Sequence, residues 1–413
     1  MKCIKALLVF FFIGYQVHVT HAQSVSVCAG CAVNSIKKAI ELSNPFDTIY
    51  VEKGVYHESE ISIEKPLTLI GRGMPVIDGE EKGEIIGIKS DSVSIIGFDI
   101  RNVGVSKTKD FSAIHVRESN YFYIKDNILS GVFFGLLVEK SKDGIIEGNI
   151  ISGNAIIEYN AGNGIHLWNC KRIEVLKNEL FGLRDGIYLE FVTESKITNN
   201  YSRDNLRYGL HFMFSDKDEY SHNRFINNGA GVAVMFSKFI SMHHNHFFKN
   251  WGPASYGLLL KEIYDGEIED NVFEENTTAI QTDGSTRINY RRNDFIRNGW
   301  AVKVTGGCYT NIFIQNNFVA NSFDISYNSK MNDNLFDGNY WSSYTGYDLD
   351  KDGVGDIPFR PVNLFSYVVS KSPEAMVLLR SLFVDIINFS EKVSPIFTPD
   401  NLLDNNPLMR EVK

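Results

Sequence analysis

A repeat of about 22 residues constrains this chain more than any other feature of its sequence. Its clearest copies lie between Gly209 and Phe247, where a glycine opens an alternating apolar run and an apolar-x-x-Asn-x-Phe segment follows. The first copy reads GLHFMF and then YSHNRF, and the second reads GVAVMF and then MHHNHF. A chain that repeats at this period is expected to fold as a solenoid, in which each unit packs against its neighbours.

Asparagine marks one position of each repeat, and a glycine or alanine opens a short alternating strand between successive asparagines. The recurring asparagines are Asn127, Asn149, Asn178, Asn200, Asn223, Asn245, Asn271, Asn293 and Asn317. Alternation with a period of two, punctuated by Gly and Asn, is typical of strands and turns and excludes helical repeats. The sequence therefore predicts a right-handed, pectate-lyase-like parallel β-helix. Its handedness follows from the usual chirality of parallel crossovers, and its asparagines should stack at one turn.

Both ends of the chain depart from the repeat. Val33 to Leu42 has the apolar spacing of a short amphipathic helix that would cap the first coils. The repeat decays after about Ser326, and Ser372 to Phe389 has the broad apolar face of one helix. We expect the tail from Val393 to Lys413 to be extended and poorly ordered unless bound. The expected segments are a signal peptide over 1–22, a β-helix over 23–335 and a C-terminal extension for partner docking over 336–413.

The N-terminus predicts secretion. A basic start, the apolar run Ala6 to Tyr15, and the small residues Thr20 and Ala22 at positions −3 and −1 form a signal peptide, and this run is too short to span a bilayer. The net charge of −9, with both signs interspersed, provides no basic stripe and excludes nucleic acid as a partner.

Alternation along each strand assigns side chains to faces. In Gly209–Phe214, Leu210, Phe212 and Phe214 would point inward, so His211 and Met213 would point outward. The same parity predicts a first outer row of His115, Leu137, His166, Tyr188, His211, Ala233, Leu259, Gln281 and Lys303. It predicts a second row of Arg117, Glu139, Trp168, Glu190, Met213, Met235, Lys261, Asp283 and Thr305. Extra loop residues at 155–163 and 250–256 would form the rims of a groove around the coils from His166 to Met235.

Soft and imidazole ligands gather in these central coils. The candidates are His166, His211, Met213 and Met235 on the groove face, and His222, His243, His244 and His246 at the asparagine turn. His222 and His244 hold the same repeat position and should stack. Thioether together with imidazole suits Cu(I), so we predict a Cu(I) face. The alternative is that Met and His merely tolerate exposed strand positions.

The cysteines allow two interpretations. Cys28 and Cys31 form a CxxC segment, which is either a local disulfide or terminal feature, or a soft-metal site. Cys170 and Cys308 lie too many coils apart to pair, so we expect buried free thiols.

An acidic loop after the repeats resembles the front of a calcium loop. Asp348, Asp350, Asp352 and Asp356 supply oxygen ligands at the appropriate spacing, but Phe359 stands where the twelfth-position glutamate would be. The loop is therefore either a calcium-stabilised turn or a solvated acidic loop, and in both cases structural.

Polysaccharide-cleaving enzymes are an alternative for this fold. A hydrolase needs paired carboxylates and a lyase needs a carboxylate cluster with a basic residue, but Trp168 interrupts Glu139 and Glu190 in their row, and Asp185 and Asp283 are isolated. Trp168 and Tyr188 could still stack on a sugar. A carbohydrate-binding adhesin without cleavage is a third possibility.

Several stretches together resemble the NosD family, the periplasmic β-helix proteins of nitrous oxide reductase maturation. These stretches are GVYHESEISIEKPLTLIGRG near the start, LRYGLHFMFSD and GAGVAVMFS in the centre, and GNYWSSYTGYDLDKDGVGDIPFRPV at the exit. The CAGC segment lies outside the family pattern.

The resemblance implies a non-enzymatic accessory protein of the periplasm that handles Cu(I) transiently. Its implied partners are the membrane subunit and ATPase of an ABC transporter, a copper chaperone lipoprotein and nitrous oxide reductase. In that family the C-terminal segment engages the transporter's membrane subunit, which would hold the protein at the inner membrane and suits the apolar segment Ser372–Phe389.

Overall fold

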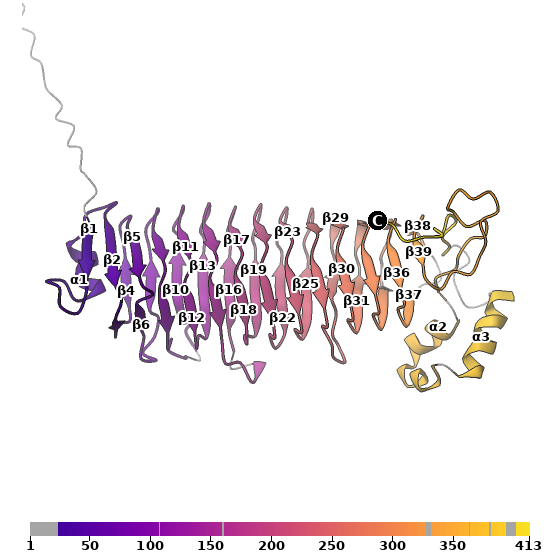
Figure 1. Cartoon of the computed structure of the whole chain (residues 1–413), viewed down its shortest axis with the longest axis horizontal. Coiled ribbons are helices and arrows are strands. Elements are labelled where there is room, and N and C mark those ends of the chain that lie inside the picture. The colour runs from indigo at the N-terminus through magenta and orange to yellow at the C-terminus, as the bar shows by residue number, and fades with distance from the viewer. Residues whose placement is uncertain are drawn as a thin grey trace, which may run out of the picture.

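The computed structural model describes residues 24–106, 108–158, 161–327, 332–362, 364–379, 381–393 and 402–413. The expected signal peptide at 1–22 lies outside the described residues. The described chain is a right-handed parallel β-helix of about 14 turns, so the predicted fold class is confirmed. Each full coil contributes one strand in turn to three parallel sheets, which run the length of the molecule (Figure 1).

Three sheets, here called A, B and C, contain all the named strands, and every strand within them pairs in parallel with the corresponding strand of the next coil. Sheet A comprises β1 (Ser24–Val27), β2 (Thr48–Glu52), β5 (Thr68–Arg72), β8 (Ser94–Ile96), β11 (Tyr123–Lys125), β14 (Ile145–Glu147), β17 (Glu174–Leu176), β20 (Lys196–Thr198), β23 (Glu219–Ser221), β26 (Ser241–His243), β29 (Tyr264–Glu269), β32 (Thr286–Arg291), β35 (Ile312–Ile314) and β38 (Leu335–Asp337). Sheet B comprises β3 (Val55–Tyr56), β6 (Val76–Asp78), β9 (Asp99–Arg101), β12 (Ile128–Ser130), β15 (Ile150–Ser152), β18 (Glu179–Phe181), β21 (Tyr201–Arg203), β24 (Arg224–Ile226), β27 (His246–Phe248), β30 (Val272–Glu274), β33 (Asp294–Ile296), β36 (Asn317–Val319) and β39 (Tyr340–Trp341). Sheet C comprises β4 (Ile61–Ile63), β7 (Ile86–Ile88), β10 (Ser112–Arg117), β13 (Phe134–Glu139), β16 (Asn163–Trp168), β19 (Asp185–Glu190), β22 (Tyr208–Met213), β25 (Ala230–Met235), β28 (Leu258–Lys261), β31 (Thr278–Asp283), β34 (Trp300–Thr305) and β37 (Phe323–Tyr327). The coils thus continue past residue 335 to Trp341.

The core consists of like side chains stacked coil upon coil, because residues at one repeat position lie one interstrand spacing apart. Phe225, Phe247 and Phe273 form such a column, with ring centroids 5.4 and 4.4 Å apart. The inward assignment of Phe214 was wrong. β22 ends at Met213, and Phe214 lies in the following turn at φ 50°, 42% exposed and stacked on Phe236.

The asparagines form a buried ladder, as predicted. Each side-chain carbonyl accepts hydrogen bonds from the backbone N–H and side-chain Nδ2 of the asparagine one coil earlier, at 2.9 and 3.0 Å for Asn149 bonding to Asn178. After Asn293 the ladder continues through Asn316 and Asn339, so the choice of Asn317 was wrong by one residue. A second ladder was not predicted; it runs through Asn205, Asn228, Asn250, Asn276, Asn298 and Asn321.

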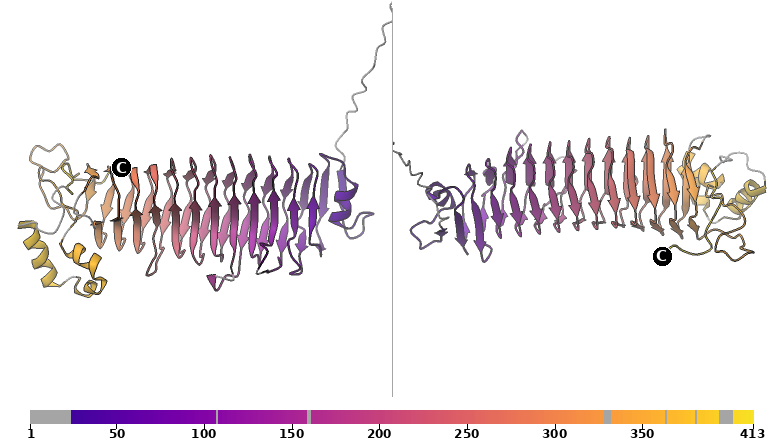
Figure 2. Two further views of the ribbon diagram at one scale, coloured as in Figure 1. Left: turned by 180° about the vertical axis from the view of Figure 1, so that it is seen from behind. Right: turned by 90° about the horizontal axis from the view of Figure 1, so that it is seen from above.

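Helices close the two ends of the stack (Figure 2). At the N-terminal end, α1 (Ile36–Leu42) begins after Ser35, whose side chain accepts a hydrogen bond from Lys38 N–H. At the other end lie α2 (Leu364–Lys371), the 3-10 helix η2 (Pro373–Leu378) and α3 (Leu382–Val393). The single helix predicted over Ser372–Phe389 is therefore wrong, because Pro373 begins a separate turn and the chain changes direction before α3. None of the described helices is long and apolar enough to cross a bilayer.

The C-terminal tail does not match the expected extended segment where it is described. Residues 402–413 pack against the last coils, and the fully buried Asp404 carboxylate forms the final rung of the asparagine ladder. It accepts hydrogen bonds from Asn339 Nδ2 at 3.0 Å and from Trp341 Nε1 at 2.9 Å. The chain end therefore supplies a hydrogen-bond acceptor where the solenoid has no further coil.

A buried carboxyl group inside the solenoid gives stability a defined pH dependence. Burial raises the pKa of Asp218 to about 8, although Ser195 N–H donates to its Oδ1 at 2.8 Å and Tyr220 OH to its Oδ2 at 3.3 Å. Between the unfolded pKa near 4 and pH 8, the folded state binds more protons than the unfolded state, so this group makes stability fall as pH rises, by at most about 1.4 kcal/mol per pH unit. We expect Asp218→Asn to remove this decline when urea unfolding is followed from pH 4.5 to 8.5. Parallel curves for the variant and the wild-type protein would contradict the assignment.

Candidate metal-binding face

Sheet C carries the two outer rows predicted from alternation. The strand register pairs His166 with Tyr188, Tyr188 with His211 and His211 with Ala233, and it continues in this way from His115 to Lys303. The second row is likewise continuous and places Met213 directly beside Met235. The order of both rows is therefore confirmed, whereas the role of their members as ligands remains a prediction.

His166 and His211 point away from the core, yet neighbouring rings cover them. His211 is only 6% exposed, with ring centroids 4.9 Å from Tyr188 and 4.8 Å from Tyr208. His166 lies 4.6 Å from Tyr188 and 5.8 Å from Phe134. The alternative of an exposed strand position is therefore wrong for His211, because Tyr188 on the adjacent coil and Tyr208 on the same strand shield it, whereas His166 is partly exposed.

The ring nitrogens of both imidazoles are buried without polar partners, although the His166 side chain as a whole is partly exposed. Neither ring nitrogen of His166 or His211 has a hydrogen-bond partner among the described residues. Burial lowers the pKa of His166 to about 4, with a smaller contribution from the Arg184 guanidinium, and burial lowers the pKa of His211 to about 4. Both rings are therefore neutral at neutral pH, which is the form that binds a metal. Buried polar atoms without partners are costly, so these four nitrogens call for an explanation.

Two thioethers extend this arrangement along the second row. Met213 follows His211 by two residues on the same face of β22, and Met235 occupies the matching position of β25. Both methionines are partly exposed, and the Tyr188 hydroxyl lies 3.9 Å from the Met213 sulfur. The structure thus brings His211, Met213 and Met235 to one surface, whereas the Tyr188 ring separates His166 from His211.

A buried ion pair supports this surface and was not identified from the sequence. The Asp185 carboxylate, fully buried, accepts hydrogen bonds from Arg207 Nε at 2.9 Å and Nη2 at 2.5 Å, and the Arg207 guanidinium stacks on the Tyr208 ring that covers His211. The alignment of the repeats could have pointed to this ion pair, because Asp185 directly precedes a strand-opening glycine, as Asn163 does one coil earlier.

The histidines at the asparagine turn form a smaller group than predicted. His222 and His244 stack as expected, with centroids 4.9 Å apart and planes 7° apart, and His243 lies beside both. His246 does not join them. It lies beyond the turn on β27, where it pairs with Glu274 at 3.3 Å.

The described cysteines have structural roles and do not form a metal site. Cys28 and Cys31 form a disulfide, so the alternative of a thiolate metal site is wrong for this state of the protein. Cys170 and Cys308 are free and buried, as expected, and burial raises the pKa of Cys170 to about 12.

The acidic loop brings part of its predicted ligand set together. Carboxylate oxygens of Asp348, Asp350 and Asp352 lie within 4.8 Å of one another, and no other described group of three His, Cys, Asp or Glu residues is that close. Asp356 instead accepts a hydrogen bond from Leu349 N–H at 2.7 Å. Calcium binding by this loop remains a prediction.

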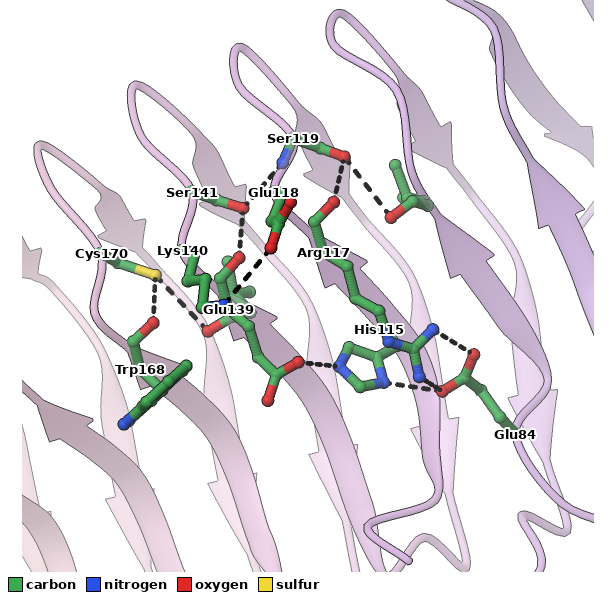
Figure 3. A network of polar contacts seen from close by, with 12 residues as sticks. Glu84, His115, Arg117, Glu118, Ser119, Glu139, Lys140, Ser141, Trp168 and Cys170 are labelled. Carbon is green, nitrogen blue, oxygen red and sulfur yellow. Dashed lines mark hydrogen bonds and ion pairs between the residues drawn. The ribbon is translucent and has the colours of Figure 1, made fainter.

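The hollow on sheet C does not coincide with the groove expected around His166 and Met235. Loops after β15 and β27 do protrude from one edge of the stack (Figure 1), but a hollow of about 600 Å³ lies two coils nearer the N-terminus, around His115. There His115 Nδ1 lies 2.7 Å from Glu84 and its Nε2 lies 3.0 Å from Glu139, while Arg117 binds Glu84 through two nitrogens (Figure 3).

Glu84 forms an ion pair with Arg117, and both Glu84 and Glu139 contact the His115 ring. Burial acts to raise the pKa of Glu84, but hydrogen bonds from His115 and Arg117 outweigh it and lower the pKa. A glycosidase requires one carboxyl group that is protonated near neutral pH. Glu84 is held in the opposite state.

Together, the fold and this face define a class: a pectate-lyase-like β-helix protein in which neutral imidazoles with buried nitrogens lie beside thioethers on one outer sheet. Comparison with known proteins shows which family the chain resembles. The model of the NosD family, described as periplasmic copper-binding protein, matches residues 149–346. This match and the two relatives described next confirm the predicted resemblance to NosD.

Two curated relatives carry the NosD name. The chain is 26% identical to "Probable ABC transporter binding protein NosD" of Stutzerimonas stutzeri, covering 86% of this chain and 85% of the relative. It is 27% identical to the protein of the same name from Pseudomonas aeruginosa, covering 84% and 85%.

Solved structures share the fold. PfbA, a surface adhesin of Streptococcus pneumoniae, matches with a TM-score of 0.57 and 12% identity over 71% of this chain and 87% of that chain. The A-module of the Azotobacter vinelandii mannuronan C-5 epimerase AlgE6 matches with a TM-score of 0.54 and 12% identity over 74% and 95%. At such low identity these likenesses establish the β-helix architecture alone.

Proposed function

We propose that this chain is a periplasmic accessory protein that binds Cu(I) transiently for the maturation of nitrous oxide reductase and is not itself an enzyme. The observation that carries the proposal is the buried His211 imidazole, which lacks a polar partner among the described residues. His211 lies two residues before Met213 on β22, and Met213 pairs with Met235 on the next coil. Thioether and neutral imidazole are ligands that favour Cu(I). His166 lies at the edge of this site, one ring beyond Tyr188.

The names of the family and relatives support the wider assignment. The family is described as periplasmic and copper-binding, and the relatives as ABC transporter binding proteins. We infer the same partners for this chain: the membrane subunit and ATPase of an ABC transporter, a copper chaperone lipoprotein that exchanges the ion, and nitrous oxide reductase as its destination. Export by the signal peptide would place the protein in the periplasm.

The C-terminal helices offer a surface suited to the transporter's membrane subunit. Several large apolar side chains of η2 and α3 are exposed, including Val377 at 86%, Leu382 at 74% and Phe389 at 69%. A contiguous exposed apolar patch is typical of a protein or membrane contact. Docking through this end would hold the β-helix at the inner membrane and leave sheet C free to meet soluble partners. A calcium ion at Asp348, Asp350 and Asp352 would stiffen the loop beside it.

The copper site can be tested by competition with a chromogenic Cu(I) chelator under anaerobic conditions. We expect the double variant Met213→Leu, Met235→Leu to lose one equivalent of Cu(I), or to bind it at least about tenfold more weakly, because leucine preserves the volume but removes the sulfur ligands. His211→Phe should have a similar effect and preserve the ring packing with Tyr188 and Tyr208.

Met74→Leu is the control, because Met74 is an exposed methionine that lies near the N-terminal end of the stack, away from the proposed site. Unchanged stoichiometry and affinity in the double variant would refute the site. Release of unsaturated or reducing ends from alginate or polygalacturonate by the wild-type protein would instead support an enzyme.

A further inference from the structure

The histidine turn between sheets A and B contains a pair of ring nitrogens already placed for chelation. His243 Nδ1 and His244 Nδ1 lie 3.1 Å apart. Two imidazole nitrogens bound to one Zn²⁺ or Cu²⁺ at about 2.0–2.1 Å would have this separation when the angle at the metal is near 100°. Without a metal, the same contact is a hydrogen bond in which one Nδ1 carries the proton and the other accepts it. A metal ion would replace that shared proton without a change in the separation of the two nitrogens.

A carboxylate orients the first of these rings. His243 Nε2 lies 3.3 Å from Glu219 Oε1 on the preceding coil. In metal sites, the nitrogen that does not bind the ion commonly donates its proton to a carboxylate, which fixes the tautomer and leaves the other nitrogen free for the metal. The Glu219 contact therefore favours a proton on Nε2 and a lone pair on Nδ1, the atom that faces His244.

A third imidazole stands next to the pair. His222 stacks on His244 at 4.9 Å and meets the His243 ring edge-on at 5.9 Å. His222 and His244 are exposed and His243 is partly exposed, so an ion can reach the group from solvent. Rotation of the His222 side chain would add a third nitrogen, and water would complete the coordination.

The ligand chemistry differs from that of sheet C. Met242, which directly precedes His243, is buried in the core, so the ligands that the described residues offer here are imidazole and carboxylate without sulfur. Imidazole suits Cu²⁺ and Zn²⁺, with Cu²⁺ bound more tightly in the usual order of divalent affinities. The site also lies on a different sheet, because His243 belongs to β26 of sheet A and His211 to β22 of sheet C.

We propose that His243 and His244 chelate one divalent ion of borderline softness, Cu²⁺ or Zn²⁺, through their Nδ1 atoms, with His222 as the third ligand and Glu219 as the positioning carboxylate. The site is independent of the Cu(I) face and does not rest on it. It gives the protein a second, solvent-facing place to hold copper in its oxidised state, or zinc in its place.

The test measures binding of CuCl₂ and of ZnCl₂, separately, to the mature full-length protein at a fixed neutral pH. We expect His243→Gln and His244→Asn each to weaken binding of both ions at least tenfold. His246→Gln should leave it unchanged, because His246 lies apart with Glu274. The Met213→Leu, Met235→Leu variant should also bind divalent ions normally, which separates failure of this site from failure of the Cu(I) site.

Spectroscopy distinguishes ligation from an indirect effect on folding. Electron paramagnetic resonance of the Cu²⁺ form should show coupling to two or three nitrogens, reduced by one in His244→Asn. In Glu219→Gln the nitrogen count should stay the same while affinity falls about tenfold, as expected for an orienting group. Wild-type affinity in both His243→Gln and His244→Asn, with circular dichroism unchanged, would overturn the proposal.

Discussion

Asp404→Ala is expected to unravel the C-terminal end of the solenoid while leaving the central coils folded. The Asp404 carboxylate accepts hydrogen bonds from Gly338 N–H at 3.1 Å, from Asn339 N–H and Nδ2 at 3.0 Å each, and from Trp341 Nε1 at 2.9 Å. Removing it leaves several buried donors unsatisfied, and each costs about 1–3 kcal/mol. Because coils of a solenoid contact only their neighbours, the loss should stay local.

Hydrogen exchange provides the measurement. Amides of β38 and β39 should exchange at least about a hundredfold faster in Asp404→Ala, which corresponds to a local loss of about 3 kcal/mol. Amides near Asn178 should keep their protection. Asp404→Asn should be intermediate, because it retains one of the two accepting oxygens. Asp350→Ala, in the exposed acidic loop, serves as the control, and equal protection in this control and Asp404→Ala would show that Asp404 does not cap the ladder.

Asn178→Ala is expected to destabilise the middle of the β-helix strongly. The Asn178 side chain accepts from Asn149 N–H and Nδ2 at 2.9 and 3.0 Å, and it donates to Ile146 O and to Asn200 Oδ1, both at 3.0 Å. Alanine removes all four hydrogen bonds and leaves buried polar groups on both adjacent coils without partners. We expect a loss of about 3–5 kcal/mol in the free energy of unfolding.

Urea unfolding followed by circular dichroism measures this loss, with Asn154→Ala as a control. Asn154 is exposed, so its replacement should change stability by about 0.5 kcal/mol or less. Cu(I) and divalent affinities of folded Asn178→Ala should match the wild-type values, because the ladder is scaffold. Equal stability of the two variants would contradict the contribution to stability that we assign to the ladder.

The asparagine ladder also shows where local pattern stops being informative. Asn316 and Asn317 are consecutive, and either fits an apolar-x-x-Asn pattern within one residue. Only the coil geometry selects Asn316 as the rung and directs the Asn317 side chain to Asp294 and Val412. Similarly, Pro373 was visible in the sequence, but the apolar periodicity around it concealed the break between α2, η2 and α3.

The sequence by itself determined the fold, both outer rows of sheet C and the stacking of His222 on His244. These features depend on the repeat period and on the alternation of side chains along each strand, and many repeats of the sequence show both. Tertiary structure alone decided that neighbouring rings shield the nitrogens of His166 and His211 without giving them polar partners, that His246 stands apart from His243 and His244, and that Asp404 ends the ladder. Each of these depends on a contact between residues on different coils, or on the direction of one side chain at a turn. Asp404 and Asn339 are brought together only because the chain end folds back on the last coil, and no local pattern records that contact.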